Sequence, residues 1–138
     1  MRYPKVVVLK DKTEAIIRPL EKKDETKLRE LYAALPEKDR WFMRHDVVNP
    51  DVVHRMIAAI GKGNVLSMVA LVGDRVVAHA SLLMRGYGCT RHVGRLRIAV
   101  MPELRHKRLG TWILLDLIQL GMDQGLDDIR ADFVVGIE

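Results

Sequence analysis

The residues best suited to chemistry form a basic loop at positions 105–108, with the sequence RHKR. The loop follows a short apolar run, 96–100, that is typical of a strand, and Pro102 ends that run because it has no N–H for a sheet ladder. After the loop, large apolar residues recur every three or four positions from 109 to 120, as on the buried face of a helix. The pattern predicts a strand, a basic loop and the N-terminus of a helix, in that order.

This arrangement favours an anion as ligand. The first turn of a helix leaves backbone N–H groups without partners and carries the positive end of the helix dipole, so phosphate binds there readily. Arg105, Lys107 and Arg108 add full positive charges, and Gly110 lets a ligand approach the backbone closely. The alternative is a solvated basic loop in which Gly110 merely packs against the sheet, and the spacing alone does not choose between the two.

At these residues the chain resembles the GNAT family of acyl-CoA-dependent N-acyltransferases. The family's pyrophosphate-binding signature is V-x-P followed by [RQ]-x-x-G-x-[GA], and this chain has VMP at 100–102 and RHKRLG at 105–110. Arg108 stands where the signature has its first glycine, so its Cβ would crowd the phosphates if the residue needs an unusual backbone conformation. The N-terminal segment, YPKVVVLKDKTEAIIRPLEKKDE, separately resembles the start of bacterial GNAT domains of protein lysine acetyltransferases.

The resemblance implies direct attack of an amine, either a protein lysine or a small amine, on the thioester of acetyl-CoA. The basic loop would bind the pyrophosphate, the strand backbone before it would hold the pantetheine, and a backbone N–H near the strand end would polarise the thioester carbonyl. Acetyl-CoA is the expected co-substrate, and no metal is expected. The predicted cofactor-binding residues are Ile98, Ala99, Val100, Arg105, His106, Lys107, Arg108, Leu109, Gly110 and Thr111.

The catalytic residues are not assigned. Many members of the family use a glutamate on the central strand as the general base, about where Arg95 stands in this chain. Glu103, Asp46 and His92 are the candidate substitutes, although Glu103 is more simply a loop residue before the phosphate site. His79, inside a predicted strand, is interpreted as a hydrogen-bonded structural histidine rather than a ligand.

The composition indicates a single globular domain over residues 1–138. Hydrophobic residues make up 49% of the chain and charged residues 30%, which is unlike a disordered protein. No apolar run approaches the roughly 20 residues that span a bilayer, and the N-terminus has no signal-peptide pattern. A single cysteine, Cys89, excludes an internal disulfide and a cysteine-based zinc site and fits the cytoplasm. The net charge of +5 favours an anionic ligand without choosing among CoA, nucleic acid and acidic protein.

Apolar periodicity and turn residues predict the remaining elements. Strands are expected over 6–9, 14–18, 65–72, 75–84, 96–100 and 127–135, and helices over 23–35, 49–60 and 109–121. This order predicts an α+β fold, the GNAT fold, with a mixed, mainly antiparallel sheet flanked by helices. The aromatic and basic residues at 37–46 are expected to tuck into the core rather than to bind nucleic acid.

Members of the family continue with another helix and a final pair of strands, so the resemblance implies a C-terminally short domain. An unpaired strand at 129–135 would pair with a second copy of the chain, as a homodimer.

The sequence is consistent with two functions. The first is an acetyl-CoA-dependent N-acetyltransferase, and the alternative is a non-catalytic module whose basic loop senses acyl-CoA or binds nucleic acid or an acidic protein. Because the sequence does not place several exposed aromatic residues near 105–108, stacking on single-stranded nucleic acid is less favoured.

Overall fold

The computed structural model describes residues 4–35, 50–58, 60, 65–84, 93–104, 107–123 and 128–135. Its strands are β1 (Lys5–Val8), β2 (Glu14–Pro19), β3 (Val65–Val72), β4 (Arg75–Met84), β5 (Val93–Val100) and β6 (Asp128–Val135). Its helices are α1 (Glu25–Ala34), α3 (Pro50–Ala58) and α4 (Leu109–Asp123), with 3-10 turns η1 (Lys22–Asp24) and η3 (Pro102–Leu104). Each predicted strand and helix is present, with its ends shifted by a few residues at most. The segment at 37–46 lies outside the described residues.

All six strands form one sheet in the order β1-β2-β3-β4-β5-β6. The first five strands are antiparallel to one another in sequence order, whereas β6 runs parallel to β5. The antiparallel strands can follow one another through short turns, such as the one at Gly73, where φ is 61° and favours glycine. The parallel pair needs a crossover, which α4 supplies. The predicted mixed, mainly antiparallel sheet is confirmed.

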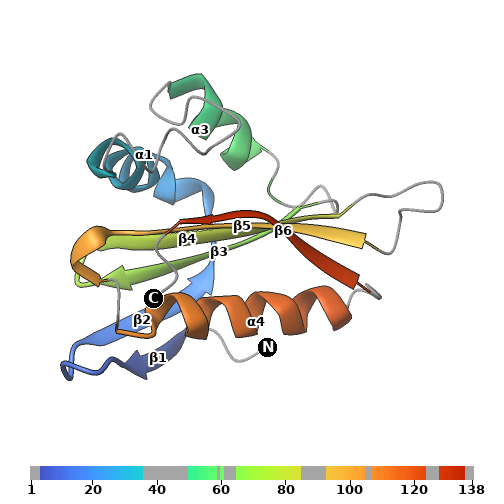
Figure 1. Cartoon of the computed structure of the whole chain (residues 1–138). Helices are drawn as coiled ribbons and strands as arrows, with labels where there is room; N and C mark the ends of the chain where they lie inside the picture. The colour runs from blue at the N-terminus through green and yellow to red at the C-terminus, as the bar shows by residue number, and fades with distance from the viewer. Residues whose placement is uncertain are drawn as a thin grey trace.

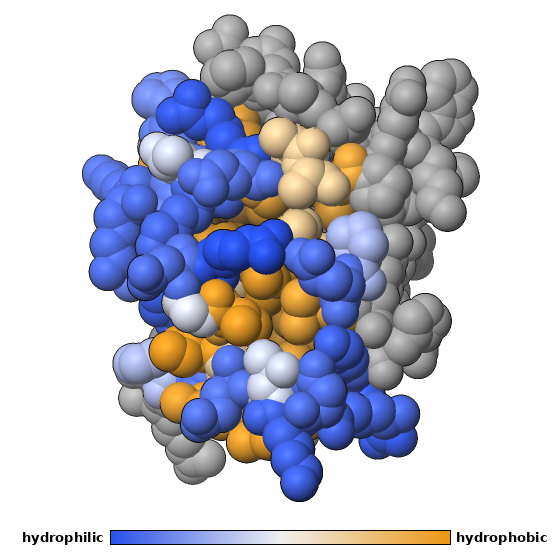
Figure 2. Space-filling model, turned by 90° about the vertical axis from the view of Figure 1, so that its left-hand side faces the viewer, coloured by the Kyte–Doolittle hydropathy of each residue, from blue (hydrophilic) through white to orange (hydrophobic). Residues whose placement is uncertain are grey.

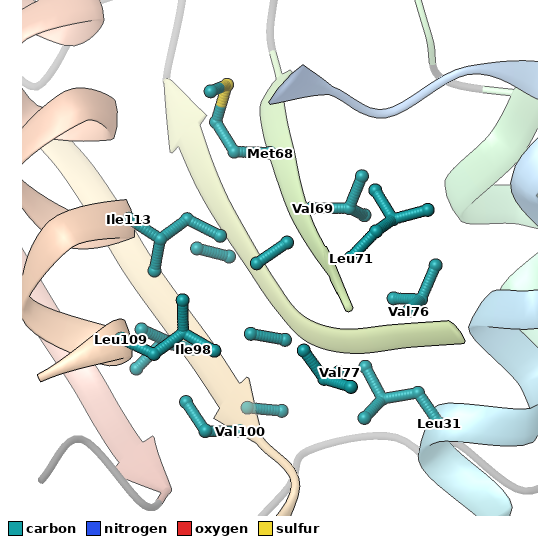
Figure 3. Close-up of a cluster of buried hydrophobic side chains, with 14 of the residues drawn as sticks. Leu31, Met68, Val69, Leu71, Val76, Val77, Ile98, Val100, Leu109 and Ile113 are labelled. Atoms are coloured by element: carbon teal, nitrogen blue, oxygen red, sulfur yellow. The ribbon is translucent and has the colours of Figure 1, made fainter. Parts of the chain in front are cut away.

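Helices cover both faces of the sheet (Figure 1). In that view α1 and α3 lie above the sheet, whereas α4 lies below it and beside the β1–β2 hairpin. Apart from Gly110, the residues that α4 buries recur at four-residue intervals along one side: Leu109, Ile113, Leu117 and Gly121. In Figure 3, Leu109 and Ile113 meet Ile98 of β5 from this side, while Leu31 of α1 approaches Val77 of β4 from the other. The periodic stripes of the sequence are thus the contact surfaces of the three layers.

The start of α1 is fixed by a buried ion pair. Arg18 of β2 donates two hydrogen bonds to Asp24, at 2.7 and 2.8 Å, and the Glu21 backbone N–H donates a third at 2.8 Å. Burial opposes ionisation of Asp24, which is 1% exposed, but these bonds outweigh it and hold its pKa below the ordinary value. The pair therefore connects the second strand to the first helix as a charged, hydrogen-bonded unit.

The N-terminal hairpin is attached to α4 and also carries apolar surface. Lys5 Nζ lies 3.2 Å from Asp116 Oδ1 and 5.3 Å from the centre of the Trp112 ring. On the opposite face of the hairpin, Val6 and Val8 remain more than half exposed. Figure 2, which looks at the side of the molecule on the left of Figure 1, shows a hydrophobic band bordered by hydrophilic residues.

Within the described ranges, no helix combines the length and the apolar character that crossing a bilayer requires.

Candidate functional site

The candidate site begins where β5 ends. Ile98, Ala99 and Val100 are fully buried, with β4 on one side of the strand. On the other side β6 runs alongside the strand, with Ile98 in register with Val134 and Ala99 in register with Val135. The chain then turns: the Met101 N–H donates to the Val77 carbonyl at 2.8 Å, and the short η3 turn follows at Pro102. The strand therefore stops at the proline, as predicted.

The helix α4 follows η3 and the basic loop and begins at Leu109. The Trp112 N–H donates to the Arg108 carbonyl at 3.1 Å, so Arg108 is the residue that precedes the first full turn of α4. The N–H groups of Leu109, Gly110 and Thr111 belong to that first turn, where an α-helix has no internal acceptor for them. This is the strand, loop and helix N-terminus that the sequence predicts for an anion site.

Arg108 has the unusual backbone that its place in the signature suggested. Its φ is 68°, in the left-handed region that glycine adopts without strain and that L-residues rarely adopt. The chain therefore keeps the glycine conformation while carrying an exposed guanidinium at that position. Arg105 and His106 lie outside the described residues.

Two ion pairs hold the loop to the neighbouring turns. Lys107 Nζ lies 2.6 Å from Asp11 Oδ2 in the β1–β2 turn, and this bond, with a smaller contribution from Thr13, holds the pKa of Asp11 well below its usual range. Glu103 of η3 is paired with Arg75 at the start of β4, at 3.0 Å. The loop is thus connected to the turns on both sides of it by side chains of opposite charge.

The model of the acetyltransferase (GNAT) family matches residues 24–135. The chain belongs to this family. Its membership confirms the family and the fold predicted from the loop and the N-terminal segment, and it places the chain among the acyl-CoA-dependent N-acetyltransferases. The β1–β2 hairpin, which contains Asp11, precedes the matched residues.

Solved structures of GNAT proteins have the same fold. The GNAT domain of S. lividans PAT aligns with a TM-score of 0.81 at 18% identity, over 94% of this chain and 80% of that one. The yncA protein from Salmonella typhimurium, with its cofactor acetyl-CoA, aligns with a TM-score of 0.70 at 23% identity, over 85% and 68%. The paia N-acetyltransferase from Thermoplasma acidophilum, in complex with coenzyme A, gives 0.67 at 16%, over 85% and 77%. No curated protein sequence matches the chain.

The residues considered for proton transfer are only partly described. Arg95 lies in β5, in register with Leu83 of β4 and Arg130 of β6, at the central-strand position predicted for it. Glu103 is held by Arg75, while Asp46 and His92 lie outside the described residues. Among the residues that the structure describes, no group of His, Cys, Asp or Glu is arranged to hold a metal ion.

His79 is a buried structural residue, as predicted. It is 1% exposed, and its Nδ1 lies 2.6 Å from the hydroxyl oxygen of Tyr32 on α1. The two rings meet edge to face with their centres 5.8 Å apart. No sequence pattern pairs Tyr32 with a residue 47 positions later in the chain.

Sequence reasoning also missed Asp11. The segment 10–13 has the composition of a turn, and the structure confirms a turn there, but no sequence pattern connects it with a lysine 96 residues later. The contact depends on how the hairpin folds against α4, which is a property of the packed sheet.

Proposed function

We propose that this GNAT protein transfers the acetyl group of acetyl-CoA to an amine, either a protein lysine or a small amine. The observation that carries the proposal is the start of α4, where Arg108 takes the glycine backbone of the pyrophosphate signature in the connection that follows β5 and η3. Such a helix N-terminus favours phosphate through its N–H groups and its dipole. The proposed pyrophosphate contacts are Arg105, His106, Lys107, Arg108, Leu109, Gly110 and Thr111.

The pantetheine is proposed to run along β5 at Ile98, Ala99 and Val100. The acceptor nitrogen would attack the thioester carbonyl carbon, the carbon–sulfur bond would break, and CoA would leave as the thiolate. The nitrogen must lose a proton in this reaction, and Glu103, Asp46 and His92 remain the candidates to receive it.

Calorimetric titration with CoA tests the placement of the ligand. The double variant Arg105→Ala/Lys107→Ala should bind CoA at least about three-fold more weakly, and the loss should be larger at low salt, because charge-assisted contacts are removed. The matched control is Lys22→Ala/Lys23→Ala, which removes the same charge from exposed residues of η1 and should leave the affinity unchanged. Equal affinity of the loop variant and the wild type would reject the placement.

Turnover of acetyl-CoA distinguishes an acetyltransferase from a non-catalytic binding module. Release of free CoA from acetyl-CoA in the presence of an amine panel of peptides and small amines is expected from an acetyltransferase. Binding of acetyl-CoA without turnover of any acceptor would instead favour the acyl-CoA-sensing module, and binding of oligonucleotide with a steep salt dependence would favour the nucleic-acid module. A cytoplasmic location remains a prediction of the sequence.

A homodimer through the C-terminal strand also remains a proposal. Within the described sheet, β6 is the last strand in the order, and a strand in that place can pair with another copy. Light scattering over a concentration series tests this association, and a constant monomer mass would reject it.

A further inference from the structure

The contact between Asp11 and Lys107 joins the proposed pyrophosphate loop to the N-terminal hairpin. The Lys107 ammonium donates to Asp11 Oδ2 at 2.6 Å, while Asp11 Oδ1 accepts the backbone N–H of Thr13 at 3.0 Å. Both carboxylate oxygens are therefore used, one inside the hairpin turn and one toward the loop. Because the bond to Thr13 holds the carboxylate in place, Asp11 is a fixed anchor for the lysine.

Each partner of this ion pair directly precedes a residue with a strained backbone. Asp11 precedes Lys12, with φ 70°, and Lys107 precedes Arg108, with φ 68°. Within the described ranges, these are the only residues other than glycine that have positive φ. A left-handed backbone is unfavourable for such residues and persists where surrounding contacts hold it. The ion pair supplies a contact of this kind next to both strained turns at once.

We propose that Asp11 is a positioning residue for CoA binding. By holding Lys107, it keeps Arg108 in its left-handed conformation and so keeps the first N–H groups of α4 ordered before the ligand arrives. A loop that is ordered in advance loses less conformational freedom on binding, and the affinity rises accordingly. This inference rests on the proposed function, because it takes the same loop to be the pyrophosphate site.

The two effects of Asp11 on CoA affinity, its negative charge and its contact with Lys107, act in opposite directions. Asp11→Asn removes a negative charge beside a site for an anion, and on charge alone it should strengthen CoA binding. If Asp11 positions the loop, the same change should weaken binding by about two- to five-fold, in line with the modest strength of exposed ion pairs. The matched control is Glu14→Gln, which removes the same charge from an exposed position on the same hairpin and should not weaken binding.

The decisive measurement is the same substitution in an Arg108→Gly background. Glycine adopts positive φ without help, so Asp11→Asn should change the CoA dissociation constant of Arg108→Gly by less than about 1.5-fold. Calorimetry on the four proteins (wild type, two single variants and the double variant) gives this comparison, and urea unfolding verifies that each one folds. Tighter or unchanged CoA binding by Asp11→Asn, or the same loss in both backgrounds, would overturn the proposal. A wild type that does not bind CoA would instead reject the function on which it rests.

Discussion

Replacing Arg108 with glycine should raise the stability of the free protein. A residue other than glycine in the left-handed region costs roughly 1–2 kcal/mol, and Arg108 has a φ of 68°. Glycine removes that strain, but it also gives the unfolded chain more freedom, which offsets about 0.5–1 kcal/mol. The net gain expected in the free energy of unfolding is about 0–1.5 kcal/mol, and a gain of about 1 kcal/mol corresponds to roughly 2–4 °C in the melting temperature.

The same substitution should weaken CoA binding. If the exposed guanidinium contacts a phosphate, its loss removes about 1–3 kcal/mol of charge-assisted hydrogen bonding. That range corresponds to about a 5- to 150-fold increase in the dissociation constant. Arg108→Gly is therefore expected to be more stable and to bind more weakly. Opposite changes in stability and affinity would distinguish the effect of the Arg108 backbone on stability from the effect of its side chain on CoA binding.

Urea unfolding and calorimetric titration measure the two effects, and Lys12→Gly is the control. Lys12 has a φ of 70° in the β1–β2 turn, so its replacement should give a similar gain in stability without a loss of CoA affinity. Two results would refute the reasoning. One is an Arg108→Gly protein that is less stable than the wild type. The other is a variant that binds CoA more tightly, which would mean that Cβ at this position obstructs the phosphates.

Three further substitutions test the fold that supports the site. Tyr32→Phe removes the 2.6 Å hydrogen bond to His79 and should lower the free energy of unfolding by about 1–2 kcal/mol, and an unchanged urea midpoint would contradict it. Asp24→Asn removes the carboxylate that accepts two hydrogen bonds from Arg18, although Glu21 still lies 3.3 Å from the guanidinium, and should cost about 1–3 kcal/mol by the same measurement. Because the folded-state pKa of Asp24 lies below its unfolded value of about 3.9, the stability from this pair should be present above about pH 4 and lost as the pH falls through the folded pKa, so the acid loss should shrink in the variant. Leu117→Ala empties a fully buried position on α4 and should cost about 2–5 kcal/mol, whereas a loss below 1 kcal/mol would mean that the helix repacks.

The sequence was sufficient for the strands and helices and for the unusual backbone at position 108, because both depend on local patterns. The stripe of α4 and the proline after β5 are visible within a few residues of the chain, and the structure has a helix and a strand end at those places. The family signature indicated that position 108 prefers glycine, and the left-handed backbone of Arg108 agrees with it. In these cases the cause and its effect lie close together in the sequence.

The contacts between distant elements could not be predicted. The partners of His79 and Lys107 come from α1 and from the β1–β2 turn, and each depends on which face of the sheet an element covers. The pairing of Arg18 with Asp24 joins residues only six positions apart, but it too requires the chain to turn between β2 and α1. Side-chain contacts of this kind depend on how the layers pack. They can be predicted only when the topology of the sheet and the positions of the helices are known.

Because β5 changes from antiparallel to parallel pairing, we expect the β5–β6 pair to form later in folding than the β3–β4 hairpin. The β3–β4 hairpin closes through a short turn, and such hairpins form within about 1–10 μs. The β6 strand can reach β5 only after the whole of η3 and α4 has been made and placed across the sheet, and non-local pairing of this kind is slow. During synthesis or refolding, the edge of β5 that later pairs with β6 is therefore expected to stay unpaired for longer than its other edge. Aggregation of the folding chain should begin at that edge, and a peptide that occupies it should slow refolding without affecting the native protein.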